Sequence, residues 1–227
     1  MQMASDEFYS SNSQRYAEGS NHSLQIPYDN ASHPKLTGNM DLIARMKELV
    51  AQNAKGLDAG CGAGARDVFL YWSAGYDISG VDVVPENILV AQEAHPEISD
   101  RVSVADLSAS LELPGGQFDF VLCNAVIQHI SPTLIRDVTL PELARVLKVG
   151  GVLQLMFKIG DGMATVFDNA YNTHRTFQLY DADTITSILS GLGLEVLPAD
   201  ENKLSGVMYF TDPKPMDHCV LFARKLK

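Results

Sequence analysis

"GLDAGCGAGARD", residues 56–67, places three glycines at every second position, directly after a short apolar run that ends in a carboxylate. The glycines are Gly60, Gly62 and Gly64, and the carboxylate is Asp58. Glycine costs backbone entropy, so such a cluster marks a tight turn or a close approach by another group. We interpret the stretch as a strand, a turn and the beginning of a helix.

Strand-like runs alternate with helical patterns from about residue 36 onward. Strands that alternate with helices pair in parallel through right-handed crossovers. The sequence therefore predicts an α/β three-layer sandwich in a single domain spanning 1–227, with a doubly wound, mostly parallel seven-stranded sheet and an antiparallel C-terminal strand. The seven runs are KGLDAG, YDISGVDV, RVSVAD, FDFVLCNAV, GVLQLMFK, LEVLPA and DHCVLFARK.

Three residues or pairs of residues predict where helices begin or are interrupted. Ser131 followed by Pro132 predicts a capped helix start, and Asp181 predicts another. Pro141 lies inside the helical pattern of residues 132–147, so we expect a kink or break there.

Two segments fall outside the alternation. Residues 1–35 are rich in Ser, Asn, Tyr and His and show little periodicity, which predicts a loose arm with at most a short helix around SNSQRYAEG. Residues 159–180 form an insertion between the fifth strand and the helix at Asp181. Both segments are expected on the substrate side.

Composition narrows the class of protein. The formal net charge of −11 argues against a nucleic-acid partner, which needs clustered Lys and Arg. Three widely separated cysteines match neither a disulfide framework nor zinc spacing, and they indicate a reducing compartment. The polar N-terminal stretch lacks the apolar core of a signal peptide, and no run approaches a membrane span. We expect a cytoplasmic protein, monomeric or homodimeric, that does not bind membranes.

The glycine loop admits two interpretations. In an open α/β sheet, ligands bind outside the carboxyl ends of strands, where the strand order reverses. Gly60, Gly62 and Ala65 fit a weak dinucleotide pattern, with Asp82 on a ribose hydroxyl. Against it, Asp58 would repel a pyrophosphate in that crevice. A sulfonium cofactor with a methionine tail and an adenosine carries no phosphate and fits the charges.

Five segments follow one another along the chain: LDAGCGAGARD, GVDVVPENI, VADL, FDFVLCNAVIQHI and ELARVLKVGGVLQL. In this order and spacing they resemble the class I S-adenosylmethionine-dependent methyltransferases, and the resemblance covers roughly residues 36–223. It implies S-adenosyl-L-methionine as cofactor, S-adenosyl-L-homocysteine as product, and in-line methyl transfer to an O, N or C atom of a small-molecule metabolite.

The resemblance also implies cofactor contacts. Asp58 faces the methionine ammonium, Asp82 accepts hydrogen bonds from both ribose hydroxyls, and Asp106 accepts from the adenine amino group. The alternatives are a turn residue for Asp82 and a helix cap for Asp106. The implied cofactor-binding set is Asp58, Ala59, Gly60, Cys61, Gly62, Asp82, Val83, Asp106, Leu107 and Asn124.

Candidates for the chemistry come from three places. His129, just beyond the fourth strand, is a candidate base near neutral pH, or else a histidine that orients its loop. From the arm, Tyr16 and Tyr28 either close the site or bury their rings, and Tyr16 is a candidate partner for His129 in catalysis. In the insertion, His174 and Arg175 are candidates for substrate binding, and Arg175 suits an anionic group. The alternative for Arg175 is a structural ion pair.

Several functions stay open at this point. The segment NAVIQHI lacks the acid-or-amide, two prolines and aromatic ring typical of enzymes that methylate bases. Lys158 stands where the fifth strand of a magnesium-dependent relative needs an anionic ligand, so no metal is expected. The alternatives are a protein methyltransferase, an NAD(P)-dependent oxidoreductase, and a cofactor-binding module without catalysis.

Overall fold

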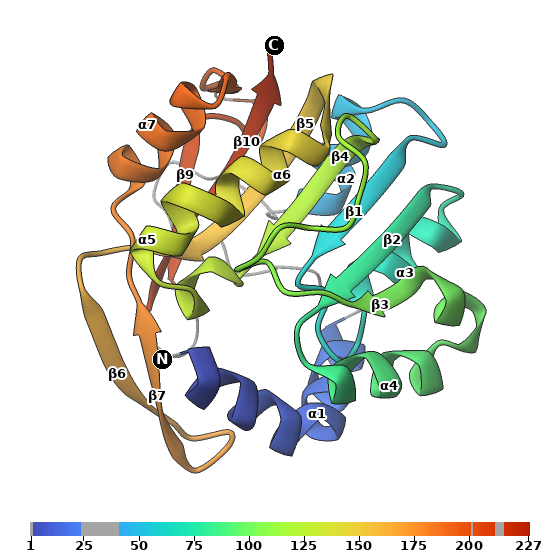
Figure 1. Ribbon diagram of the computed structural model, residues 1–227, viewed down its shortest axis with the longest axis vertical. Coiled ribbons are helices and arrows are strands. Elements are labelled where there is room, and N and C mark those ends of the chain that lie inside the picture. The colour runs from blue at the N-terminus through green and yellow to red at the C-terminus, as the bar shows by residue number, and fades with distance from the viewer. Residues whose placement is uncertain (1, 24–40, 201, 212–215) are drawn as a thin grey trace.

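A twisted, mostly parallel sheet forms the centre of the computed structural model, which describes residues 2–23, 41–200, 202–211 and 216–227 (Figure 1). The strand order is β3-β2-β1-β4-β5-β10-β8, and β9 pairs with β10 beside this path. Within the described residues the main sheet thus has eight strands, one more than predicted. Its strands are β1 Lys55–Ala59, β2 Asp77–Asp82, β3 Val102–Val104, β4 Phe118–Asn124, β5 Leu147–Lys158, β8 Leu194–Val196, β9 Val207–Thr211 and β10 Asp217–Lys225.

The pairing confirms the doubly wound arrangement. β1 pairs in parallel with β2 on one side and with β4 on the other. β10 runs antiparallel between β5 and β8, as expected for the C-terminal strand. The strand order therefore reverses between β1 and β4, which is where an open α/β sheet binds its ligands.

Two apolar clusters, one on each face of the sheet, make the three layers. Side chains of a strand alternate between faces, so Val121 and Cys123 of β4 lie in one cluster while Phe120 and Leu122 lie in the other. The first cluster includes side chains of α6 and α7, and the second includes side chains of α2, α3 and α4. These helices are α2 Leu42–Leu49, α3 Arg66–Ser73, α4 Pro85–Ala94, α6 Leu140–Val146 and α7 Ala182–Gly191.

The predicted helix signals are present in the structure. Ser131 caps α5, Pro132–Leu134, by accepting a hydrogen bond from the Leu134 amide, and the Asp181 carboxylate accepts one from Thr184 at the start of α7. Before Pro141 the chain makes a π-helical turn, Ile135–Thr139, in which the Leu140 amide donates to the Ile135 carbonyl. Proline lacks an amide hydrogen, and this wider turn is the irregularity that it imposes. The short 3₁₀ helix η1, Pro96–Arg101, precedes β3, and the short 3₁₀ helix η2, Ile127–His129, follows β4.

Three elements differ from the sequence prediction. The arm is not loose: α1 is a 22-residue helix, Gln2–Ser23. The insertion forms a separate antiparallel hairpin of β6, Met163–Asp168, and β7, Thr173–Gln178. The polar C-terminal connection contains β9. α1 depends on contacts with segments distant in the sequence, which local periodicity does not record, whereas β9 pairs with the next strand, β10, and the strands of the hairpin pair with each other.

α1 lies across the end of the sheet, between the β6–β7 hairpin and α4 (Figure 1). It therefore covers the side of the sheet on which the carboxyl ends of β1 and β2 open. Among the described helices, none combines the length and apolar character that a bilayer crossing requires.

Candidate active site

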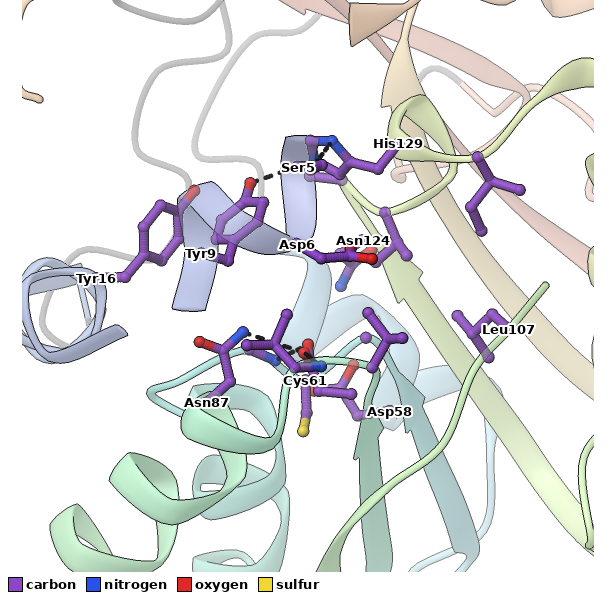
Figure 2. Close-up of a pocket in the computed structure, with 18 of the residues that line it drawn as sticks. Ser5, Asp6, Tyr9, Tyr16, Asp58, Cys61, Asn87, Leu107, Asn124 and His129 are labelled. Atoms are coloured by element: carbon purple, nitrogen blue, oxygen red, sulfur yellow. Dashed lines mark hydrogen bonds between the residues drawn. The ribbon is translucent and has the colours of Figure 1, made fainter. Parts of the chain in front are cut away.

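A cavity of about 360 Å³ lies at the carboxyl ends of β1, β2 and β4, beneath α1 (Figure 2). This position is the reversal point of the strand order. Its volume falls within the range of roughly 300 to 1,000 Å³ that is usual for small-ligand sites.

The glycine turn forms the floor of this cavity. Gly60 has a φ of +94° and Gly62 a φ of +66°, a backbone region that other residues rarely adopt. A Cβ at Gly60 would lie 2.3 Å from a methyl carbon of Val126, so this position also needs glycine for close approach. The Gly60 and Cys61 amides both donate to the Val81 carbonyl, at 2.8 and 2.9 Å, which ties the turn to β2.

Asp82, the last residue of β2, is held in one orientation. One carboxylate oxygen accepts from the Gly62 amide at 3.0 Å, and the other accepts from the Val84 amide and the Asn87 side chain, each at 3.0 Å. Burial raises the pKa of Asp82, and these three hydrogen bonds oppose that rise. The result is an oriented acceptor on the cavity wall.

Asp58, in β1, is a buried carboxylate that faces the same cavity. Its relative exposure is 4%. Within the described part of the chain, no hydrogen bond to this carboxylate is present. Burial, and next the neighbouring Asp67, raise the pKa of Asp58 well above its usual value. A buried carboxylate is costly without a partner, so the geometry favours a cationic group beside Asp58.

A polar chain connects β5 to the first turn of α3 behind Asp58. The Gln154 amide donates to Asn124 at 2.9 Å, and the Asn124 amide donates to Asp67 at 3.2 Å. Arg66 completes the chain as an ion pair with Asp67 at 2.6 Å. Asn124 was predicted at this site. Asp67 was not predicted, although it is the last residue of the stretch GLDAGCGAGARD.

On the opposite wall, α1 and His129 hold each other. The Ser5 hydroxyl lies 2.9 Å from Nδ1 of His129, and the Tyr9 hydroxyl lies 3.2 Å from Nε2. Burial, together with the nearby cations of Arg175 and Lys158, lowers the pKa of His129 to about 3. The ring is therefore neutral near pH 7, with both nitrogens hydrogen-bonded to α1.

Comparison with known proteins bears on this arrangement. Residues 57–155 match a family model described as a methyltransferase domain, and this span contains the glycine turn, Asp82 and His129. Within residues 57–155 the chain is thus similar to a methyltransferase domain, and solved structures that share its fold include S-adenosylmethionine-dependent methyltransferases.

Two curated relatives give the scale of the similarity. Over 98 residues the chain is 33% identical to 2-methyl-6-phytyl-1,4-hydroquinone methyltransferase of Synechocystis sp., covering 43% of this chain and 30% of that protein. Over 133 residues it is 31% identical to arsenite methyltransferase of Aquipseudomonas alcaligenes, covering 53% and 37%. The chain thus spans well under two thirds of the length of these curated relatives.

Solved structures share the fold. A SAM-dependent methyltransferase of Methanosarcina mazei aligns with a TM-score of 0.67 at 21% identity, over 82% of this chain and 99% of that one. The 1,6-didemethyltoxoflavin-N1-methyltransferase of Burkholderia thailandensis, solved with its substrate and S-adenosylhomocysteine, aligns at 0.59 and 19% identity, over 97% and 90%. The cyclase SpnF also aligns, with a TM-score of 0.61 at 17% identity over 96% of each chain, so fold alone does not settle the reaction.

Most of the residues predicted to bind cofactor come together in the structure. All of them line the cavity except Ala59, whose side chain is fully buried beneath it. Asp106 accepts a hydrogen bond from the Ser108 amide within a turn, and no helix begins there, so the structure does not support the alternative of a helix cap. Lining residues that sequence reasoning missed are Ser5, Asp6, Tyr9, Arg66, Asp67, Val84, Asn87, Ala125, Val126, Ile130 and Met156.

The candidates for chemistry separate into two groups. His129 and Tyr16 line the cavity, but the tyrosine that meets His129 is Tyr9. The Tyr16 ring instead packs edge-on against Tyr9 and stacks on Tyr171, with centroids 5.0 and 5.8 Å away. Contacts between α1 and distant segments left no signal in the sequence.

The candidates for substrate binding lie elsewhere. Arg175 is buried behind the wall, where it pairs with Asp168 at 3.2 Å and donates to the Tyr9 hydroxyl at 2.5 Å. His174 is exposed, because neighbouring residues of a strand point to opposite faces. Neither residue lines the cavity, and Tyr28 lies outside the described residues. Within the described ranges, no group of three His, Cys, Asp or Glu side chains is arranged to hold a metal ion.

Proposed function

We propose that this chain transfers a methyl group from S-adenosyl-L-methionine to an O, N or C atom of a small molecule by in-line displacement and releases S-adenosyl-L-homocysteine. The observation that carries the proposal is the buried carboxylate of Asp58, which accepts no hydrogen bond within the described residues, beside the oriented carboxylate of Asp82. These acids suit a cofactor that brings an ammonium and a ribose but no phosphate.

The charges of the wall fit that cofactor better than a dinucleotide. Asp58, Asp67 and Asp82 surround the glycine turn, and Arg66 forms an ion pair with Asp67. A pyrophosphate would add negative charge where burial and like charges already raise the pKa of Asp58. An ammonium at Asp58 would relieve this repulsion. We assign the ribose hydroxyls to Asp82 and the adenine to Asp106 and Leu107.

When bound, S-adenosyl-L-methionine supplies a methyl group that its sulfonium has already activated. The chain must then align the acceptor and exclude water. α1 covers the cavity and serves the second task. We propose that Tyr16 and His129 line the acceptor side. Both nitrogens of His129 are hydrogen-bonded in this conformation, so it can take a proton directly from the methyl acceptor only if Ser5 or Tyr9 moves away.

We further propose that the enzyme acts in the cytoplasm as a monomer or homodimer, without a nucleic-acid or membrane partner. Its three cysteines, Cys61, Cys123 and Cys219, are all unpaired, which supports a reducing compartment. The net charge of −11 supports an acceptor other than nucleic acid.

A labelling experiment tests the function. The purified protein is incubated with methyl-labelled S-adenosyl-L-methionine and a size-fractionated cell extract, with the Asp82→Ala variant as control. We expect label in a compound of the small-molecule fraction for the wild type only. Label in the protein fraction would instead identify a protein methyltransferase. Binding of S-adenosyl-L-homocysteine without label in any fraction would identify a module without methyl-transfer activity.

A further inference from the structure

The cavity wall contributed by α1 carries one acidic side chain, Asp6. Figure 2 shows its carboxylate facing the cavity near Asn124, across from Asp58 and Cys61 on the strand side. Burial, and then the charges of Asp106 and Asp82, raise the pKa of Asp6. The negative charges of Asp82 and Asp106 therefore act on Asp6, although Asp6 lies on α1 and they lie on the strand side of the cavity.

No basic side chain balances Asp6. Arg66 is the one Lys or Arg on the wall among the described residues, and it pairs with Asp67. Arg175 lies behind the wall, paired with Asp168. Lys158 is also behind the wall, with Nζ 3.1 Å from Nε2 of His218. Of the lining residues, five are Asp and one is Arg, so acids predominate on the wall.

The proposed function leaves Asp6 unassigned. Asp58, Asp82 and Asp106 are assigned there to the ammonium, ribose and adenine of the methyl donor. The remaining acid on the strand side, Asp67, forms an ion pair with Arg66. Asp6 shares its helix face with Tyr9, three residues on, and the rings of Tyr9 and Tyr16 line the same wall. A carboxylate beside tyrosine rings is the environment that favours an organic cation.

Resting on the proposed function, we infer that the methyl acceptor is an amine, bound as an ammonium ion against Asp6, and that Asp6 sets this specificity. A carboxylate, phosphate or other anionic acceptor would meet an uncompensated negative wall. Asp6 is then a residue that contacts the acceptor.

The reaction balances with these groups. The bound ammonium transfers one proton to the Asp6 carboxylate and becomes a neutral amine. The nitrogen lone pair forms the new bond to the methyl carbon, the carbon–sulfur bond breaks, and its electron pair stays on sulfur, which becomes a neutral thioether. The product leaves as a methylated ammonium, and the proton on Asp6 passes to water.

Three probes that share a ring but differ in charge test the inference: benzylamine, benzyl alcohol and benzoate. Each is titrated by calorimetry into the protein saturated with S-adenosyl-L-homocysteine. The Asp6 carboxylate attracts the ammonium of benzylamine and repels the carboxylate of benzoate. We therefore expect benzylamine to bind at least about tenfold more tightly than benzoate. Benzyl alcohol should fall between them.

Two variants locate the effect. Asp6→Asn should lower the ratio of benzylamine to benzyl alcohol affinity by about tenfold. Glu7→Gln removes the same charge from the adjacent, exposed position of α1 and should leave the ratio unchanged. Both variants must still bind S-adenosyl-L-homocysteine, which shows that they are folded.

The outcomes separate the two proposals. If S-adenosyl-L-homocysteine does not bind the wild type, the proposed function fails and this inference fails with it. If it binds but benzylamine does not bind, or benzoate binds as tightly as benzylamine, only the amine inference is overturned. The same holds if Asp6→Asn keeps the wild-type ratio or Glu7→Gln loses it.

Discussion

The two walls of the cavity were built by different kinds of contact. On the strand side, Asp82 bonds to the amides of Gly62 and Val84, which lie 20 and 2 residues away in the chain. On the α1 side, Ser5 meets His129 across 124 residues, and Tyr9 meets Arg175 across 166. The contacts of Asp82 therefore join segments that are close in the sequence, whereas those of α1 form only when distant parts of the chain come together. Mutations on the two walls should differ accordingly.

The largest expected effect is on the strand wall. Asp82→Ala removes an acceptor that we assign to two ribose hydroxyls, and hydrogen bonds to a charged group are worth about 1.5–3 kcal/mol each. Affinity for S-adenosyl-L-homocysteine should therefore fall at least roughly 100-fold by calorimetry. The control, Asp77→Ala, removes an exposed acid at the other end of the same strand, where it pairs with Arg101. Unchanged affinity in Asp82→Ala would remove Asp82 from the donor site.

The glycine turn should show two distinct costs. Gly60→Ala and Gly62→Ala both place a side chain at positive φ, which costs about 1–2 kcal/mol. Only Gly60→Ala also drives a methyl group into Val126, and overpacking adds about 1–3 kcal/mol. Urea unfolding should show the larger loss of unfolding free energy for Gly60→Ala, with partial recovery on adding Val126→Ala. Equal losses for the two glycines would contradict the close approach at Gly60.

On the α1 wall, smaller effects on stability should accompany an effect on turnover. His129→Phe removes the partner of Ser5 and Tyr9, and we expect it to cost about 1–2 kcal/mol of unfolding free energy. Turnover should fall because α1 loses its attachment, while affinity for S-adenosyl-L-homocysteine stays within about twofold. His174→Ala, on the exposed face of the hairpin, serves as the control. Wild-type turnover in His129→Phe would leave His129 with a structural role alone.

The smallest expected effect is a pH dependence of stability. His129 has a pKa of about 3 in the folded protein and about 6.5 when unfolded. Between these values the unfolded chain binds a proton that the folded chain does not, so His129 makes stability fall as the pH drops below about 6.5. The raised pKa of Asp58 acts in the opposite direction. Urea midpoints of wild type and His129→Phe should therefore converge from pH 7 to pH 5; parallel curves would contradict a neutral, buried His129.

Sequence reasoning reached the sheet and the strand wall because their signals are local. Apolar runs, the caps at Ser131 and Asp181, and the glycine turn each act within a few residues, and the structure contains all of them. Asp67, in α3, was not predicted because its partner Asn124 lies at the end of β4, 57 residues further along the chain.

The three elements that the sequence did not predict have different causes. α1 has no continuous apolar stripe, so its 22-residue length is not evident from periodicity. The β6–β7 hairpin lies off the main sheet, and β9 becomes a strand only by pairing with β10. Alternation along β7 turns Arg175 inward and His174 outward, but the sequence does not show which face is covered.

A crystal structure of the complex with S-adenosyl-L-homocysteine shows directly which group of the ligand each carboxylate contacts. We expect both ribose hydroxyls on Asp82 and the amino group beside Asp58. An empty cavity at saturating ligand, or a ligand seated with its ribose away from Asp82, would contradict it.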